Sequence, residues 1–140
     1  GDVSAKNFYG IAHTALWSDL AEFYESDEPY ESGTLIKFGG EKEITIACDG
    51  EVNGIVSTKP GVVLNSEAKG LPIALAGRVP TKIVGPISKH DKVVLSDIPG
   101  VGRKAIFPAD KSLTIIGRAL ESKSGSDIGL VECVTKFSLV

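Results

Sequence analysis

Short apolar runs, separated by glycine, proline and polar corners, make up most of the chain from residue 34 onward. The runs are rich in Val, Ile, Thr and Leu, and they cover residues 34–38, 43–48, 53–58, 61–65, 71–79, 81–85, 92–96, 103–107, 113–121 and 129–137. Many short β-rich runs with turn signals between them are typical of an all-β barrel or sandwich. The pattern therefore predicts a compact, barrel-like (β-clip-like) all-β domain of many short strands over residues 25–140.

Glycines and prolines set the expected corners of this domain. Gly39 and Gly40 can both adopt positive φ, so they predict a hairpin turn between the first two runs. Pro80 has no backbone N–H to donate, so it predicts a bulge or an edge in an otherwise central strand pair, and a break between runs 71–79 and 81–85.

Two segments resemble each other without gaps: "YESGTLIKF" at residues 30–38 and "ISKHDKVVL" at residues 87–95. Each has an apolar residue, a polar turn and then an apolar run. Two explanations are open at this point. The chain contains duplicated halves related by a pseudo-twofold axis, or two turn-then-strand units share similar chemistry.

The N-terminal segment differs from the rest, because six of the nine aromatic residues fall within the first thirty positions. Leu16, Leu20, Phe23 and Tyr24 have helical spacing, which predicts a short helix in an aromatic arm over residues 1–24. Aromatic side chains of this size need burial. They can pack on the open end of their own barrel or against a neighbouring chain, and aromatic enrichment favours an interface.

Composition and charge exclude several classes of protein. The 15 Lys and Arg residues are scattered and the net charge is −3, so no basic stripe for nucleic acid is present. No apolar run approaches the length that would insert in a membrane. Cys48 and Cys133 are expected to be reduced core thiols, with a disulfide as the alternative if their strands are neighbours. The chain has no Met and is expected to be a domain of a longer protein.

Candidate chemistry in the sequence is weak. Lys89, His90 and Asp91 form a polar corner before a strand, which is ordinary turn chemistry. Ser57 and Lys59 have the composition of a Ser–Lys dyad, but Pro60 follows and predicts a strand end instead. The acids between the arm and the first strand lack calcium-loop spacing and predict a solvated linker; they are Glu22, Glu25, Asp27, Glu28 and Glu31. We therefore predict no catalytic residue, no cofactor and no metal site.

Four phrases in combination carry a resemblance: "SDLAEFYESDEPYESGTLIKFGG", "GIVSTKPGVVLNS", "IALAGRVPTKIVGPISKHDKVVLS" and "IIGRALESKSG". Together they resemble the C-terminal domain of tailed-bacteriophage tail fibre and tailspike proteins, from about residue 15 onward. They are also similar to the core of the peptidase G2 group, which are autoproteolytic intramolecular chaperones. The family usually has Gly where His90 stands, so we expect a different turn at this corner.

The resemblance implies a structural virion module that is a homotrimer. It would be the head or cap of a tail fibre or baseplate-associated fibre, fixing trimer register and contacting other tail or baseplate proteins and a host surface receptor. Such a protein is located in the virion and assembled in the bacterial cytoplasm. The aromatic arm would then be the end of the shaft, where three copies bury Phe8, Ile11, Leu16, Trp17 and Leu20 around the axis. The alternatives are a self-cleaving chaperone domain and a carbohydrate-binding module, although few aromatics outside the arm are available to stack on sugars.

Overall fold

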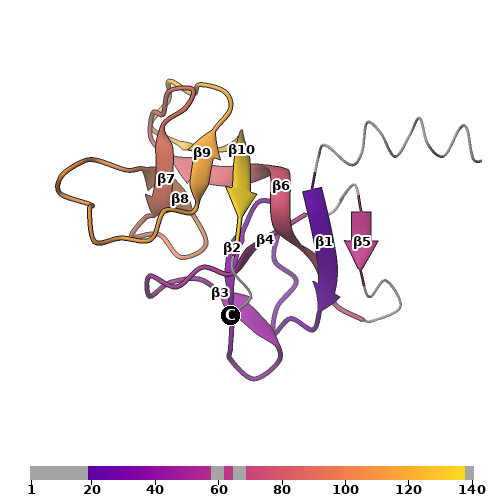
Figure 1. Cartoon of the computed structure of the whole chain (residues 1–140). Helices are drawn as coiled ribbons and strands as arrows, with labels where there is room; N and C mark the ends of the chain where they lie inside the picture. The colour runs from indigo at the N-terminus through magenta and orange to yellow at the C-terminus, as the bar shows by residue number, and fades with distance from the viewer. Residues whose placement is uncertain (1–18, 58–61, 65–68, 138–140) are drawn as a thin grey trace, which may run out of the picture.

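The computed structural model describes residues 19–57 and 69–137, together with the backbone of residues 62–64, and it is all-β there (Figure 1). The strands are β1 (Asp19–Tyr24), β2 (Leu35–Phe38), β3 (Ile44–Ile46), β4 (Gly54–Val56), β5 (Val62–Leu64), β6 (Leu71–Val84), β7 (Lys92–Leu95), β8 (Gly102–Lys104), β9 (Gly117–Ala119) and β10 (Ile128–Lys136). The predicted fold class is confirmed. Among the described residues, no helix is long and apolar enough to cross a bilayer.

A closed ring of five strands forms the second half of the domain. Strands β10, β9, β7, β8 and β6 follow one another in that order, and β6 pairs with β10 to complete the circle. The ring closes through nine residue pairs between β6 and β10, from Val84↔Ile128 to Ala76↔Lys136. Its other closing contact is the parallel pair Ile83↔Gly102 between β6 and β8. This ring is the barrel that the short strands predict.

The first half repeats this arrangement on the other side of β6. Strands β6, β4, β2 and β3 follow the order of β10, β9, β7 and β8, and each pair of neighbours is antiparallel in both halves. Ser26, just after β1, forms a parallel bridge with Ile44 on β3, as Ile83 does with Gly102. Because β1 also pairs with β6, the 14-residue β6 belongs to both rings.

Individual hydrogen bonds repeat as well, which favours the duplicated halves over a chance similarity of turns. Gly33 N donates to Val56 O at 2.8 Å, and His90 N donates to Ala119 O at 2.7 Å. The register pairs Ile36 with Gly54 in one half, and Val93 with Gly117 in the other. A Cβ at Gly54 would lie 2.3 Å from Ile73 Cγ2, and one at Gly117 would lie 2.3 Å from the Val134 carbonyl oxygen. Both halves therefore need a glycine where β4 or β9 approaches its neighbour.

Two apolar cores fill the domain. One contains Ile36, Ile44, Val56, Ile73 and Leu75. Tyr24 and Phe38 pack against this core, and their two rings meet edge-to-face with centroids 5.1 Å apart. The other fills the second ring and the opposite face of β2, β4 and β6. Its largest fully buried members are Leu35, Ile55, Val79, Ile83, Val93 and Val131. Both faces of β2, β4 and β6 are therefore buried. This explains why their sequences are almost continuously apolar rather than alternating.

The short helix predicted in the arm is wrong over residues 19–24, which form β1. Leu20, Phe23 and Tyr24 have helical spacing, but the backbone of this segment pairs with β6 on one side and with β5 on the other. Two ladders of hydrogen bonds outweigh a weak local preference. These six residues thus belong to the sheet, whereas residues 1–18 lie outside the described part of the chain.

Pro80 does not break the strand, since β6 runs through it and Pro80 is paired with Glu132. The reason is the alternation of hydrogen-bonded and non-hydrogen-bonded pairs in antiparallel ladders. The Glu132 carbonyl oxygen accepts from Leu120 N at 2.7 Å, and Glu132 N donates to Glu121 Oε1 at 2.9 Å, so its backbone faces away from β6. The missing N–H of Pro80 therefore leaves no gap in the β6–β10 ladder.

Candidate functional site

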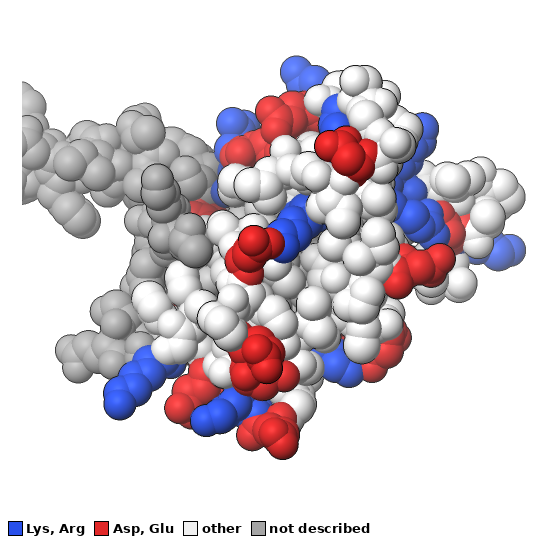
Figure 2. Space-filling view, turned by 180° about the vertical axis from the view of Figure 1, so that it is seen from behind, with Lys and Arg blue, Asp and Glu red and all other residues white. Residues whose placement is uncertain are grey.

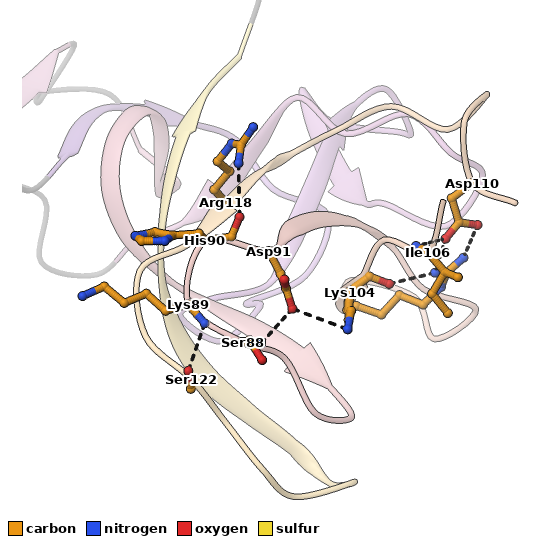
Figure 3. Close-up of polar contacts among 10 residues, drawn as sticks. Ser88, Lys89, His90, Asp91, Lys104, Ile106, Asp110, Arg118 and Ser122 are labelled. Atoms are coloured by element: carbon orange, nitrogen blue, oxygen red, sulfur yellow. Dashed lines mark hydrogen bonds and ion pairs between the residues drawn. The ribbon is translucent and has the colours of Figure 1, made fainter. Parts of the chain in front are cut away.

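The corner at residues 88–91 is a β-turn, as predicted. Asp91 N donates to Ser88 O at 3.0 Å, and the Asp91 carboxylate accepts from Ser88 N at 2.8 Å. Lys89 N donates to Ser122 Oγ at 2.9 Å, and the Lys104 ammonium lies 3.8 Å from the Asp91 carboxylate. Figure 3 shows the His90 ring pointing away from that carboxylate, so the two do not form a base and its orienting acid.

The expectation of a different turn at His90 is wrong. His90 has φ of 80°, close to the 92° of Gly33 in the equivalent turn of the first half. A positive φ at the third residue is the geometry of a type II turn, which favours glycine. His90 keeps this geometry because its N–H donates to Ala119 O and its carbonyl oxygen accepts from Arg118 Nη1 at 3.2 Å.

The other sequence candidates are structural where the chain is described. Ser57 is buried at the end of β4, while Lys59 lies outside the described residues. Asp27 accepts hydrogen bonds from Thr45 Oγ1 and Tyr30 Oη, both at 2.7 Å, and these bonds lower the pKa of its carboxyl. No group of three or more His, Cys, Asp or Glu residues in the described part of the chain could hold a metal ion.

The cysteines are both free, and only one of them lies in the core. Cys133 is buried on β10, and burial raises the pKa of its thiol to about 11. Cys48 is exposed just after β3, so its expected place in the core is wrong. The short β3 ends at Ile46, before the pattern of apolar residues ends.

The residues predicted to form the trimer interface lie mainly outside the described part of the chain. These are Phe8, Ile11, Leu16 and Trp17. Leu20 is described: it is partly buried on β1, where it pairs with Val62 on β5 and with Ala76 on β6. The structure therefore leaves that interface as a prediction.

A loop over residues 106–115, called the inserted loop below, is one difference between the two halves. Ala47 N donates to Leu35 O, as Ala105 N does to Lys92 O, and Asn53 N donates to Ile36 O, as Ile116 N does to Val93 O. Between these matched bonds the first half has residues 48–52 and the second has residues 106–115, so the second carries extra residues. The apolar runs predict strands over 103–107 and 113–121, but the strands are only Gly102–Lys104 and Gly117–Ala119.

Asp110 organises the inserted loop from within. Its carboxylate accepts from Arg103 Nη1 at 2.7 Å, from Arg103 Nη2 at 2.9 Å and from Ile106 N at 2.7 Å. The Arg103 guanidinium, followed by the Ile106 N–H, lowers the pKa of this carboxyl to about 2. Bidentate pairs of this kind fix both distance and orientation. The loop is therefore ordered although it has no strand.

The ordered loop presents apolar side chains to solvent. Ile106 is 59% exposed and Phe107 is 51% exposed, and Leu113 and Ile115 are about 40% exposed as well (41% and 40%). The Lys92 ammonium lies 5.2 Å from the centre of the Phe107 ring, which is within cation–π range. A rigid loop with several exposed apolar residues is a candidate contact surface. The feature of the sequence that could have indicated this ordered loop is Asp110, the sole acid of residues 106–115, which lies seven residues from Arg103.

A second exposed apolar surface lies on β10. Ile128 is 46% exposed, Leu130 is 55% exposed and Val134 is 42% exposed, and all three point to the same face of the strand. Ile128 and Leu130 line a groove of about 490 Å³ together with Glu31, Ser32, Lys82, Val101 and Gly129. Glu31 also lines a hollow of about 330 Å³ with Glu28, Pro29, Tyr30, Thr34, Ile46, Lys82, Pro99 and Gly100, so the two concavities adjoin.

Comparisons with known proteins identify the fold. No protein-family model matches the chain, and no curated protein matches it. The chain is similar to the crystal structure of the pre-mature bacteriophage phi29 gene product 12, with a TM-score of 0.65 and 14% identity over 86% of this chain and 22% of that one. It is similar also to the crystal structure of the bacteriophage phi29 gene product 12 C-terminal fragment, with a TM-score of 0.61 and 14% identity over 84% of this chain and 100% of that one. The chain thus spans about a fifth of the pre-mature protein, and its fold is one found in a bacteriophage protein.

Proposed function

We propose that this domain is a structural module of a bacteriophage tail: the trimeric head or cap of a tail fibre or baseplate-associated fibre. The observation that carries the proposal is the fold match, which covers 84% of this chain and the whole of the gene product 12 C-terminal fragment. A match over the full length of a separately crystallised fragment indicates a domain that is used as a unit. The phage fibre motifs in the sequence support the same context.

The uses of the polar side chains among the described residues favour a mechanical role over an enzymatic one. The polar side chains that cluster there are committed to turns and loops, as with Asp91 in the corner and Asp110 in the inserted loop. By contrast, large apolar side chains on the inserted loop and on β10 are exposed. Exposed apolar surface on an otherwise well-packed domain is a mark of association.

Trimerisation would follow from the aromatic arm, with three copies of Phe8, Ile11, Leu16, Trp17 and Leu20 burying one another around an axis. The test is size-exclusion chromatography with light scattering on the full chain at micromolar concentration. A mass of three chains is expected. A monomer across the whole concentration range would refute the trimeric module, and a stable dimer would refute the threefold arrangement.

A self-cleaving intramolecular chaperone is the second candidate. The observation that favours it is that the similar solved structures include a pre-mature form and a separate C-terminal fragment of the same phage protein. The test is to express this domain with the segment that precedes it in its parent protein and to measure the masses of the products. A defined cut that a single substitution in this domain abolishes would support self-cleavage, and an intact product would exclude it.

A further inference from the structure

We propose that the hollow beside Tyr30 binds a neutral oligosaccharide. This hollow, called the Tyr30 hollow below, has a volume of about 330 Å³. It adjoins the groove on β10, of about 490 Å³, through Glu31 and Lys82, which line both. Both volumes fall within the range of small-molecule sites in proteins, which is about 300–1,000 Å³. The inference adds a ligand to the proposed tail module and does not depend on trimerisation.

The same hollow occurs in both halves of the domain, but with different side chains. The hollow of the second half, called the second hollow below, has a volume of about 590 Å³. It corresponds to the Tyr30 hollow because residues 87–95 align with residues 30–38 and Ala105 is the counterpart of Ala47. Four pairs of equivalent residues line the two hollows: Pro29 and Pro86, Tyr30 and Ile87, Glu31 and Ser88, and Ile46 and Lys104. The fold therefore supplies the hollow twice, and the side chains distinguish the two.

Tyr30 gives its hollow a rigid apolar wall. The hydroxyl group of Tyr30 donates to Asp27 Oδ1 at 2.7 Å, which fixes the side chain. Tyr30 nevertheless stays partly exposed and lines the hollow together with the exposed Pro29 and Pro99, whereas its counterpart Ile87 is 3% exposed. A fixed aromatic residue loses little conformational entropy when a ligand packs on it. Such a wall suits the C–H face of a sugar ring.

The polar side of the Tyr30 hollow is an ion pair that faces solvent. The Lys82 ammonium donates to Glu31 Oε1 at 2.6 Å, and the Glu31 side chain is 82% exposed. Because a carboxylate has two oxygens and an ammonium has three N–H groups, this pair offers acceptors and donors side by side. A hydroxyl group both donates and accepts, so neighbouring hydroxyls of a sugar match the pair. Glu28, which is exposed at the same hollow, adds a further acceptor.

Other classes of ligand fit the Tyr30 hollow less well. An anionic ligand would meet the carboxylates of Glu28 and Glu31. A purely apolar ligand would remove water from the Glu31–Lys82 pair without replacing its hydrogen bonds, which costs free energy. Positive and negative side chains are interspersed on the face that Figure 2 shows, so that face has no field of one sign to attract a charged polymer.

Backbone hydrogen bonding argues against a peptide in this hollow. An extended peptide binds by pairing with unused backbone groups at a sheet edge. Four lining residues already donate their backbone N–H groups to carbonyl oxygens of the chain itself; they are Tyr30, Thr34, Lys82 and Gly100. The polar groups that the hollow offers are therefore mainly side chains, which favours a ligand that is recognised through hydroxyls.

The experiment exposes the full chain to an array of short neutral and acidic oligosaccharides, and then titrates the strongest binder into the protein in solution. We expect binding to neutral oligosaccharides. Tyr30→Ile and Glu31→Ser give the Tyr30 hollow the side chains of the second hollow. Each should lower the affinity about tenfold or more, because the first removes an aromatic anchor and the second removes hydrogen bonds to a charged group. Glu31 is exposed, so Glu31→Ser keeps the test valid even where Tyr30→Ile impairs folding.

Matched controls are Ser88→Ala and Lys104→Ala, which truncate polar side chains of the second hollow. These variants should bind as the wild-type chain does, and circular dichroism and melting temperature should show that they fold. Unchanged affinity in Glu31→Ser, or stronger binding of acidic oligosaccharides, would overturn the inference. A loss of binding confined to the control variants would also overturn it, because the ligand would then lie in the second hollow.

Light scattering on the same samples separates this result from that for the trimer. A trimer that binds no neutral oligosaccharide of the array would overturn the inference and leave the tail module intact. A monomer that binds one, with the loss in Glu31→Ser, would refute the trimeric module and support the site.

Discussion

Replacing His90 with glycine should stabilise the domain, because His90 occupies a backbone conformation that suits glycine. Its φ is 80°, and the equivalent residue of the first half is Gly33, with φ of 92°. A side chain in the left-handed region costs about 1–2 kcal/mol. Glycine gives back about 0.4–1 kcal/mol through its greater freedom in the unfolded chain. The net gain is therefore about 0.5–1 kcal/mol in the free energy of unfolding.

Removing the imidazole ring itself should cost little stability. The hydrogen bonds that hold His90 use its backbone N–H and carbonyl oxygen, and the ring points away from Asp91 (Figure 3). Urea unfolding at pH 7 measures the gain, and a thermal melt should show a rise of about 2–4 °C. His90→Ala is the control, since it removes the ring but keeps the Cβ and hence the strain.

The equivalent change in the other half should have the opposite sign. Gly33→Ala introduces a Cβ at φ of 92° and places it 2.5 Å from Leu130 Cδ2. The half-exposed Leu130 side chain can move aside, so the backbone term of about 1–2 kcal/mol dominates. The Cβ gives back about 0.4–1 kcal/mol by restricting the unfolded chain, so the expected net loss is about 0.5–1 kcal/mol. If His90→Gly proves no more stable than His90→Ala, the conformational reasoning is wrong. Stability changes of the same sign for His90→Gly and Gly33→Ala would contradict the equivalence of the two turns.

Three further predictions concern side chains inside the domain. The Asp110 pKa of about 2 lies below its ordinary 3.8. The pair with Arg103 should therefore stabilise the inserted loop fully above about pH 4 and lose that effect as the pH falls through 2. Limited proteolysis across this range is the test, and Asp110→Asn should be cleaved even at pH 7. Lys123→Met should cost about 1.5–3 kcal/mol in urea unfolding, because its ammonium donates to three backbone carbonyl oxygens, and a loss below about 0.5 kcal/mol would refute this role. A disulfide-exchange reagent should modify Cys48 alone in the native chain and Cys133 only after unfolding, because the Cys133 thiol is buried with a pKa of about 11.

Local patterns predicted the strands well where apolar runs end at real turns. The hairpin at Gly39 and Gly40 is present, with both glycines at positive φ, and runs such as 92–96 and 129–137 correspond to β7 and β10. The repeat between residues 30–38 and 87–95 also marked equivalent turns. In these places the same residues that favour a strand also terminate it, so local and tertiary preferences agree.

Prediction failed where pairing with distant strands decided the conformation. Residues 19–24 have helical spacing but form β1, because β5 and β6 offer it two ladders. Pro80 looked like a break, but its lack of an N–H does not matter at a non-hydrogen-bonded position. Neither register is visible in a single sequence, since each depends on a partner at least 40 residues away.

The inserted loop shows why the candidate surface was missed. Its apolar residues, such as Ile106 and Ile115, have the composition of strands, and the predicted strands extended into it. What keeps them out of the sheet is the pairing of Asp110 with Arg103, seven residues apart, which holds the backbone in a compact turn. Sequence composition alone does not distinguish an exposed isoleucine from a buried one.

Because β6 belongs to both rings and lies in the first half of the sequence, the second half has no complete ring of its own. Cutting the polypeptide after β6 would leave the second half without that strand, and the apolar interior of its ring would be open to solvent. A chain that held only residues 85–137 would have to recruit a strand from another molecule to close its ring, as in a domain-swapped dimer.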